Sequence, residues 1–348
     1  MTNQPTRSTN VNGVGLSKND YRGANSTLCA GCGHNSIANQ IIAACYELDL
    51  APETVMKFSG IGCSSKSPTY FLSRSFGFNS LHGRMPSVAT GASFGDYHLK
   101  PLAVSGDGDT ANIGMGQFKH IMRRNVNMMY IVENNGVYGL TKGQFSATAE
   151  EGLKLKGQGV NQYKAVDICL EALVSGATFI ARSFAGDAKQ VKDLIKAAIS
   201  HRGIAVLDII SPCVTFNDAI GSHHSYAWSK ENETPIHDLM YVPFRDEIML
   251  AEEFEEGTYQ DVTLHDGSVV RLKKLDRDYD PTNRRAAFNV LDAAADDNIL
   301  LTGLIYVDPN RPVLTDLYNL TDMPLNRLTP EQIRPSREAL AKINDMMF

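Results

Sequence analysis

The sequence predicts an α/β protein with a doubly wound parallel sheet. Short apolar runs alternate with amphipathic segments between residues 100 and 210, and several of these runs end in glycine and polar residues. Alternation of this kind is typical of strands and helices that follow one another in a parallel sheet. The clearest unit spans 100–142, where one apolar run ends in GDGD (106–109) and the next ends in ENNG (133–136). We expect a ligand site there, because open parallel sheets bind ligands beyond the carboxyl ends of their strands.

Two kinds of ligand match the GDGD turn by pattern. Gly106, Gly108 and Ala111 fit the dinucleotide fingerprint GxGxxA, with Glu133 as the acid that would bind the ribose. This interpretation is physically poor, because it places two carboxylates in the loop that would cradle a pyrophosphate on helix amides. Carboxylates repel phosphates unless a divalent cation lies between them, and Mg²⁺ prefers oxygen ligands that it shares with substrate phosphates. The Asp at one strand end and the Asn at the next supply such ligands, so the site suits Mg²⁺-diphosphate better than NAD.

The chain before this unit is expected to contain an arm, a helix and a strand. Residues 1–26 are polar and rich in Asn, Thr and Gly, which indicates an N-terminal arm or loop. The segment CAGCGH (29–34) precedes a stretch with an apolar stripe at helical spacing, and 55–59 is an apolar strand that ends in GIGCSS. Pro86 is placed to start a further helix, since proline is favoured in the first turn.

After this unit the alternation continues to residue 210. The predicted elements are helix 166–175, strand 178–181, helix 188–201 and strand 204–210. The following stretch, 221–235, is polar. His223 and His224 lie in it, and we expect a loop role for them because adjacent side chains of an extended chain point apart.

The character of the chain changes beyond about residue 236. An acidic run at 252–256 is expected to be a solvated face, and 258–275 is predicted to form a β-hairpin with its turn at 265–267. A short helix follows at 284–296. The last forty residues contain five prolines and are predicted to form an extended arm that packs on a partner subunit or over the cysteines. The predicted division is an arm (1–26), a main domain (27–235) and a C-terminal extension of hairpin and arm (236–348).

Six cysteines occur in the chain. Cys45 and Cys169 lie on apolar helical stripes and are interpreted as core residues. The other four, Cys29, Cys32, Cys63 and Cys213, leave three possibilities open by spacing alone: a zinc site, a thioredoxin-like CxxC pair, or an iron–sulfur cluster. Cys63 and Cys213 each follow a predicted strand and so lie on the same rim as the diphosphate site, which favours electron transfer.

Composition excludes several classes of function. The chain has 348 residues, 43% hydrophobic and 21% charged, as in soluble globular proteins. A net charge of −6 argues against a nucleic-acid or anionic-membrane surface. The N-terminal residues lack an apolar signal region and no apolar run is long enough to span a membrane. We therefore expect a cytoplasmic protein.

The combination of GDGD with NNGVYGLT resembles the signature of thiamine diphosphate enzymes, and Asp107 and Asn135 are 28 positions apart. In that family the Asp, the second Asn and a backbone carbonyl two residues further on hold Mg²⁺. The resemblance implies Asp107, Asn135 and the carbonyl of Val137 as the Mg²⁺ ligands. It also implies a sheet of the thiamine diphosphate-binding type.

A more specific resemblance covers roughly residues 25–245. The motifs CAGCGH, GIGCSSK, HGRMPSVATG, GDGD, NNGVYGLTKGQ and SPCVTFND, in this order, resemble the β subunit of 2-oxoacid:ferredoxin oxidoreductases. SPCVTFND and the continuation TKGQ are most similar to the 2-oxoglutarate branch. The resemblance implies that a [4Fe-4S] cluster is bound by Cys29, Cys32, Cys63 and Cys213.

The function implied by this resemblance is the CoA-dependent oxidative decarboxylation of 2-oxoglutarate to succinyl-CoA and CO₂, with electrons passed to ferredoxin, in a reaction that can run in either direction. An α subunit is expected to supply the catalytic glutamate, in an α₂β₂ assembly, so this chain alone should be inactive. The alternatives are a pyruvate or broad-specificity 2-oxoacid enzyme, a non-oxidative thiamine diphosphate decarboxylase with a structural metal site, and a non-catalytic metal-binding module.

The expected site residues fall into two sets. The catalytic candidates, which could pair with substrate carboxylates or diphosphate, are His82, Lys66, Lys142 and Arg84. The expected cofactor-binding residues are Gly62, Cys63, Ser64, His82, Gly106, Asp107, Gly108, Asp109, Asn135, Val137, Gly139, Leu140 and Thr141.

Overall fold

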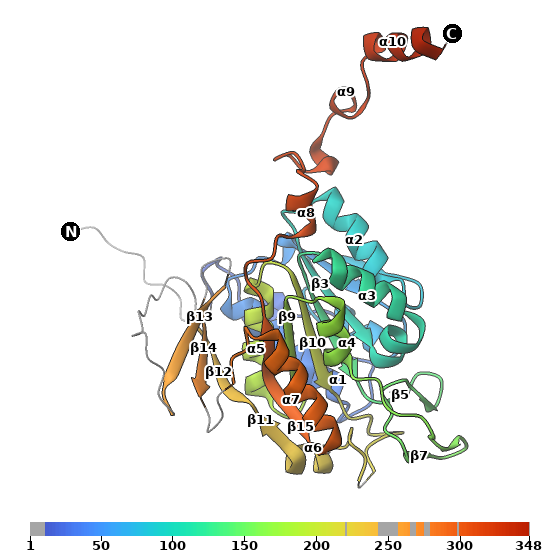
Figure 1. Ribbon diagram of the computed structural model, residues 1–348, viewed down its shortest axis with the longest axis vertical. Coiled ribbons are helices and arrows are strands. Elements are labelled where there is room, and N and C mark those ends of the chain that lie inside the picture. Colours follow the sequence, from blue (N-terminus) through green and yellow to red (C-terminus); the bar gives the residue numbers. More distant parts are fainter. Residues whose placement is uncertain are drawn as a thin grey trace, which may run out of the picture.

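A computed structural model describes residues 11–219, 221–242, 257–264, 269–274, 279–297 and 299–347. Within them, one sheet of eight strands forms the centre of the molecule, in the order β11-β15-β9-β10-β4-β3-β1-β2 (Figure 1). The strands are β1 (Val55–Ser59), β2 (Phe76–Asn79), β3 (Lys100–Gly106), β4 (Met128–Asn134), β9 (Phe179–Phe184), β10 (Ile204–Ile210), β11 (Glu233–Pro235) and β15 (Leu300–Val307). All neighbours pair in parallel except β15 with β9. The predicted doubly wound parallel sheet is confirmed for six strands, and β15 with its parallel neighbour β11 runs antiparallel to them at one edge.

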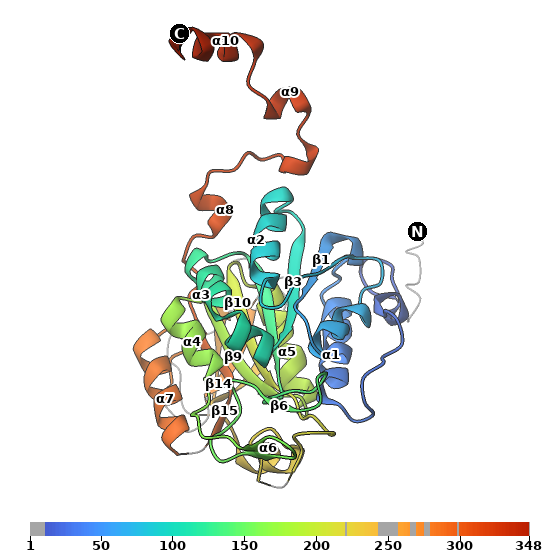
Figure 2. The same cartoon turned by 90° about the vertical axis from the view of Figure 1, so that its right-hand side faces the viewer.

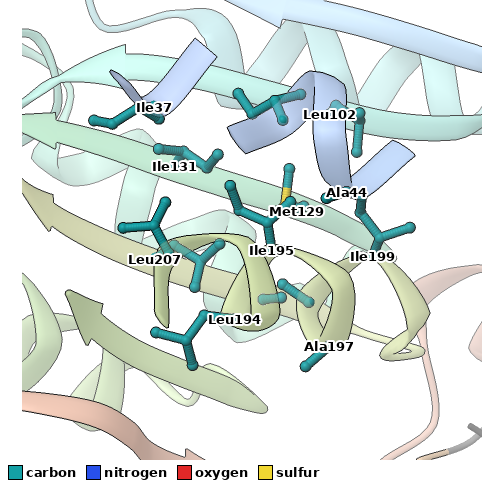
Figure 3. Packing of buried hydrophobic residues seen from close by; sticks show 14 of the residues in the cluster. Ile37, Ala44, Leu102, Met129, Ile131, Leu194, Ile195, Ala197, Ile199 and Leu207 are labelled. Atoms are coloured by element: carbon teal, nitrogen blue, oxygen red, sulfur yellow. The ribbon is translucent and has the colours of Figure 1, made fainter. Parts of the chain in front are cut away.

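Helices cover both faces of the sheet (Figure 2). One face carries α1 (Gly33–Glu47) and α5 (Ala188–Ser200), and the other carries α2 (Met85–Gly95), α3 (Met115–Arg124), α4 (Ile168–Ser175) and α7 (Arg284–Asp296). Figure 3 shows Ile37 of α1 and Ile195 of α5 packed on Ile131 and Leu207 of the strands. Because both faces are covered, the central strands β4 and β10 are buried along their whole length and mostly apolar rather than alternating.

Strand register brings four functional segments to one edge. Gly106 of β3 pairs with Glu133 of β4, and Ile210 of β10 pairs with Asn134. Ser59, at the end of β1, pairs with Val104 of β3. The segments that follow β1, β3, β4 and β10 therefore emerge side by side, and each carries one of the motifs singled out in the sequence.

For three elements the predicted first and last residues agree with the structure. These are the strands 55–59 and 204–210 and the helix 284–296. The strand–turn–helix–strand unit at 100–142 is also confirmed, but the turn after β3 winds as a π-helix (Gly108–Ile113) before α3 begins. π-helical turns are rare in proteins, and those that occur are often found at functional sites. Short elements in the loops were not predicted: β5 (Val137–Tyr138), β6 (Gln144–Phe145), β7 (Lys154–Leu155), β8 (Gly159–Val160) and α6 (Tyr226–Asn232).

The C-terminal third contains more strands than were predicted. The hairpin exists as β13 (Tyr259–Thr263) and β14 (Val269–Lys274), to which β12 (His237–Val242) adds a third antiparallel strand. Its predicted turn at 265–267 and the acidic run at 252–256 lie outside the described residues. The boundary at 235/236 stays a prediction, and the structure adds that the fully buried β15 pairs with β9 of the main sheet and that α7 packs over α4.

Beyond β15 the chain forms the predicted arm, with short helical segments. These are α8 (Leu314–Leu317), a 3₁₀ turn (Leu325–Arg327), α9 (Pro330–Ile333) and α10 (Arg337–Met347), of which α9 and α10 stand away from the body (Figures 1 and 2). Tyr97 Oη, just before β3, donates to the carbonyl of Thr321 at 2.5 Å. The arm thus leaves from the edge where β3 begins, opposite the cysteines, so the predicted packing over the cysteines is wrong. Packing on a partner subunit stays a prediction.

Candidate active site

A cavity lies where the segments after β1, β3 and β4 meet. It is lined by all thirteen residues expected from the sequence to bind the cofactor, from Gly62 to Thr141. Four further residues line it that were not among the expected cofactor-binding residues: His34, Ile61, Glu133 and Tyr138. The structure therefore gathers the predicted set in one place, and its role in binding remains a prediction.

The side chain of Asp107 is buried and held by one of its two oxygens. Oδ2 accepts hydrogen bonds from the backbone N–H of Gly136 (3.0 Å) and from Oγ1 of Thr148 (2.6 Å), and also from Oγ of Ser146. Among the described residues, no hydrogen bond reaches Oδ1. The carboxylate is thus fixed in position, with one oxygen left for a cation on the cavity side.

The turn after β4 supplies two more oxygens. Gly136 has φ +71°, and a Cβ there would lie 2.8 Å from Nδ2 of Asn217 and 2.9 Å from the ring of His224. Only glycine fits this backbone, because larger residues would be strained in it and would collide with both side chains. The turn places Asn135 and Val137 in the cavity with Asp107. A carboxylate, an amide oxygen and a backbone carbonyl match the oxygen ligands of Mg²⁺, so the residues present fit this ion.

Asp109 differs from Asp107 in that both of its carboxylate oxygens accept hydrogen bonds from the protein. Its Oδ1 accepts from the backbone N–H of Gly83 (2.9 Å) and its Oδ2 accepts from Oγ of Ser105 (2.8 Å). Oδ1 therefore anchors the turn that carries His82, while Oδ2 ties the carboxylate to Ser105 of β3. Gly83 has φ +64° and a Cβ there would lie 2.7 Å from Gly114. The sequence grouped Asp109 with the cofactor-binding residues, and the structure gives it a contact with the His82 turn.

Of the four catalytic candidates, the structure brings only His82 into the cavity. Arg84 is exposed at the start of α2, and Lys142 is exposed on the loop beyond Thr141. Lys66 follows Cys63 on a 3₁₀ turn and stands close enough to lower the pKa of that thiol, although burial raises the pKa more. The four side chains do not converge on one point, so they do not form a common carboxylate site in this chain.

Glu133 and His34 form a buried pair that sequence reasoning missed. Both carboxylate oxygens of Glu133 accept from Oγ of Ser67 at 3.0 Å, and its Oε2 lies 3.6 Å from Nδ1 of His34, which is 2.6 Å from Oγ of Ser211. Burial raises the pKa of Glu133 well above its ordinary value and lowers the pKa of His34 to about 4. Burial therefore favours the neutral form of both groups. Since Ser67 occupies its oxygens, Glu133 is not available to bind a ribose.

The four cysteines without a core role lie on the same rim. A Cβ at Gly139 would be 3.5 Å from Sγ of Cys213 and 3.6 Å from Sγ of Cys63, so these two sulfurs flank Gly139. The Cys32 N–H donates to the carbonyl of Cys29 (3.2 Å), and Oγ1 of Thr215, from the Cys213 loop, donates to Sγ of Cys29 (3.5 Å).

The sulfurs also affect one another electrostatically. Burial, with a smaller contribution from the charges of Glu133, Cys213 and Cys63, raises the pKa of Cys32 to about 12. A thiol in this setting becomes a thiolate only when cations are bound. Cys45 and Cys169 are buried in the core, as predicted. Across the described segments, no three His, Cys, Asp or Glu side chains are placed to hold a single metal ion.

His224 has the structural role expected for the 221–235 loop. Its Nε2 lies 3.1 Å from Oδ1 of Asn134 and its Nδ1 lies 3.2 Å from Oε2 of Glu150. Asn134 Oδ1 also accepts from Thr148 Oγ1 at 2.8 Å. This buried network reaches Asp107 through Thr148. It could not be predicted from any local sequence pattern.

The fold is that of a thiamine diphosphate-binding domain, and the comparisons with known proteins agree. Residues 60–209 match the family described as "Thiamine pyrophosphate enzyme, C-terminal TPP binding domain". Residues 258–322 match the family that describes the C-terminal part of the pyruvate ferredoxin oxidoreductase beta subunit.

Individual relatives narrow the class to one family. The chain is 43% identical over 191 residues to the 2-oxoacid:ferredoxin oxidoreductase subunit beta of Saccharolobus solfataricus, over 55% of this chain and 63% of the relative. It is 35% identical over 189 residues to the 2-oxoglutarate synthase subunit KorB of Methanocaldococcus jannaschii, over 54% of this chain and 69% of that protein. A solved structure of 2-oxoglutarate:ferredoxin oxidoreductase from Magnetococcus marinus, with 2-oxoglutarate, coenzyme A and succinyl-CoA bound, matches with a TM-score of 0.70 and 30% identity, over 87% of this chain and 89% of that one.

The chain belongs to the β subunits of 2-oxoacid:ferredoxin oxidoreductases. The match spans 63% of the length of the Saccharolobus relative, which is less than two thirds. No helix within the described parts of the chain is sufficiently long and apolar to cross a bilayer.

Proposed function

We propose that the chain is the cofactor-binding β subunit of a 2-oxoglutarate:ferredoxin oxidoreductase. The reaction converts 2-oxoglutarate, CoA and two oxidised ferredoxins into succinyl-CoA, CO₂, a proton and two reduced ferredoxins. The observation that supports this most strongly is Asp107, whose Oδ1 accepts no hydrogen bond from the described residues and which lines a cavity with Asn135, Val137 and two of the four cysteine-bearing segments.

Asp107, Asn135 and the carbonyl of Val137 would hold Mg²⁺, which would in turn bind the cofactor diphosphate. Thiamine diphosphate, when bound, supplies the electron sink for loss of CO₂ from a 2-oxoacid. The protein contributes the positions of its own groups. The ring of Tyr138 lies over Gly108, where a Cβ would be only 2.5 Å from it, and Tyr138 Oη donates to the Gly108 carbonyl at 3.0 Å. These contacts fix the turn that would face the diphosphate.

Four thiolates are the ligand set of a [4Fe-4S] cluster. Zinc would need its thiolates within about 2.3 Å of one point. The described cysteines offer no such single-ion arrangement, while the sulfurs of Cys63 and Cys213 flank Gly139 at the cavity wall. A cluster at Cys29, Cys32, Cys63 and Cys213 would lie beside the thiamine site and could pass electrons to ferredoxin.

2-Oxoglutarate is the proposed substrate because relatives at 40% and 35% identity are named as 2-oxoglutarate enzymes. Its second carboxylate needs a cationic or hydrogen-bonding partner, and His82 is the candidate of this chain that lines the cavity. The remaining contacts, and the catalytic glutamate, are assigned to an α subunit in an α₂β₂ assembly. A pyruvate or broad-specificity enzyme is the second candidate, favoured by the name of the family matched at 258–322.

The test is an anaerobic assay of the chain co-purified with its α subunit, in the presence of Mg²⁺, thiamine diphosphate and CoA. Ferredoxin reduction is measured with 2-oxoglutarate and with pyruvate over the same concentration range. We expect a kcat/KM for 2-oxoglutarate at least about tenfold higher, since loss of one charge-assisted contact is worth about 1.4 kcal/mol or more. A preference for pyruvate would replace the substrate assignment, and CO₂ release without ferredoxin reduction would favour the non-oxidative alternative.

A further inference from the structure

Asn217 connects the cysteine loop to the metal-binding turn. Its backbone N–H donates to the Cys213 carbonyl at 2.8 Å, which closes the turn that carries Cys213. Its side-chain Nδ2 donates to the Asn135 carbonyl at 2.9 Å. The residue is almost fully buried, and its Oδ1 accepts from Oγ of Ser222 at 2.7 Å, so the amide has one defined orientation.

The contact with the metal-binding turn is tight. A Cβ at Gly136 would come within 2.8 Å of Nδ2 of Asn217, so the turn lies directly against this side chain. The cysteine loop also begins on the same strand end, because the Ser211 N–H donates to the Asn134 carbonyl at 2.7 Å. A shift of the Cys213 loop therefore moves the support of Asn135 and Val137.

The other cysteine-bearing segment is tied to the same place. His34 follows Cys32, and its Nε2 lies 3.5 Å from Nδ2 of Asn135 while its Nδ1 lies 2.6 Å from Oγ of Ser211. The Gly33 N–H donates to the Pro212 carbonyl at 3.3 Å. Two of the cysteine segments thus meet at the backbone and side chain of the residue proposed to hold Mg²⁺.

We propose that Asn217 is a positioning residue through which cluster binding and Mg²⁺-thiamine diphosphate binding strengthen each other. The inference rests on the proposed function. Cluster thiolates fix the Cys213 loop, and the fixed loop holds the Asn135 carbonyl through Asn217. A cation and diphosphate then bind to a turn that is already ordered. By linkage, the Mg²⁺-diphosphate must favour the cluster-loaded state by the same factor.

The test measures the affinity for Mg²⁺-thiamine diphosphate by calorimetry. It uses the complex with the α subunit, dialysed free of both ligands. Wild-type complex with its cluster is compared with wild-type complex whose cluster has been removed anaerobically by a chelator. We expect cluster removal to weaken binding by about tenfold, within the range usual for coupled sites. In Asn217→Ala we expect the cluster-loaded complex to bind as weakly as cluster-free wild type, with a change of less than about twofold on cluster removal.

A matched control is Asn125→Ala, which also removes a buried Asn that donates to backbone carbonyls, here those of Arg311 and Pro312, before the start of β4 and away from both sites. This variant should lose as much affinity for Mg²⁺-thiamine diphosphate on cluster removal as wild type does. Should Asn217→Ala fail to fold, Asn217→Asp keeps the shape and loses the donor, and the wild-type comparison stands without any variant. The proposal is overturned if wild-type complex binds Mg²⁺-thiamine diphosphate equally well with and without the cluster. It is also overturned if an Asn217 variant loses as much affinity on cluster removal as wild type does. A complex that binds no cluster or no thiamine diphosphate overturns the proposed function as well, whereas independent binding of both overturns only the coupling.

Discussion

The carboxylate of Asp109 accepts a hydrogen bond from the backbone N–H of Gly83 at 2.9 Å, although the two residues are 26 positions apart. This contact joins the GDGD turn after β3 to the turn that precedes α2. It explains why His82 lies in the cavity while Arg84, two residues later, does not. The second Asp of GDGD therefore shapes the site, and the first Asp is left for the cation.

Asp109→Ala should loosen the His82 turn. It leaves the buried Gly83 N–H and the Ser105 hydroxyl without their acceptor, at a cost of about 1–3 kcal/mol in the free energy of unfolding. Denaturant unfolding of the cofactor-free protein measures this loss. Asp109→Asn keeps an oxygen acceptor and should lose less than half as much. Equal losses in the two variants would show that the contact with Gly83 is not what stabilises the turn.

Asp107→Ala should abolish Mg²⁺-dependent binding of thiamine diphosphate with no loss of iron. A ligand present at one hundred times its Kd stabilises the folded state by about 2.7 kcal/mol, which raises the Tm. Wild-type protein should show this rise when Mg²⁺ and thiamine diphosphate are added, and the variant should show none. Ser146→Ala removes one of the hydrogen bonds to Asp107 Oδ2 but leaves the carboxylate, so part of the rise should survive. A rise in Tm as large as that of wild type in Asp107→Ala would show that Asp107 does not bind the cation.

Gly108→Ala should destabilise the turn through the ring of Tyr138. The new Cβ would lie 2.5 Å from that ring, and overpacking of this kind costs about 1–3 kcal/mol. Removing the ring in Tyr138→Ala opens the space, so Gly108→Ala should cost less than a third as much in that background. The double-mutant cycle measured by denaturant unfolding gives the coupling. Identical costs in the two backgrounds would mean that backbone strain, not the ring, excludes a side chain at this position.

Acidification should weaken the fold through His237, the first residue of β12. Burial lowers the pKa of His237 to about 4 from an ordinary value near 6.5, its ring stacks on Tyr279 and its Nε2 has no hydrogen-bond partner. The folded-state pKa is the lower one, so the unfolded chain binds more protons between pH 6.5 and 4. The contribution to stability is complete above pH 6.5 and falls as the pH drops toward 4, by about 3 kcal/mol in total.

The free energy of unfolding of wild type and His237→Phe, measured between pH 7 and pH 4, tests this prediction. Phe keeps the stacked ring and cannot be protonated, so its curve should fall less steeply. Parallel curves would assign the acid sensitivity to other groups. His34 is one such group, because burial lowers its pKa as it does that of His237.

The sequence was sufficient for the local features of the fold and site. The apolar strands 55–59 and 204–210 and the GDGD–NN unit are read from short windows, and the thirteen expected cofactor-binding residues follow from motifs at strand ends. What was missed depends on contacts between distant segments. β15 was overlooked because an isolated apolar run does not reveal which sheet it joins, and it pairs with β9 more than a hundred residues earlier. The contacts of Thr148 and Glu133 could not be predicted for the same reason, since their partners Asp107 and Ser67 lie 41 and 66 positions away.

The central claim is that one thiamine diphosphate and one [4Fe-4S] cluster share the rim formed by β1, β3, β4 and β10. It is tested most directly by measuring iron, acid-labile sulfide, zinc and thiamine diphosphate in the complex purified anaerobically with its α subunit. We predict about four irons, four sulfides and one thiamine diphosphate per chain, with zinc absent. Stoichiometric zinc without sulfide would contradict the electron-transfer role of Cys29, Cys32, Cys63 and Cys213, and absence of thiamine diphosphate would contradict the assignment of the cavity itself.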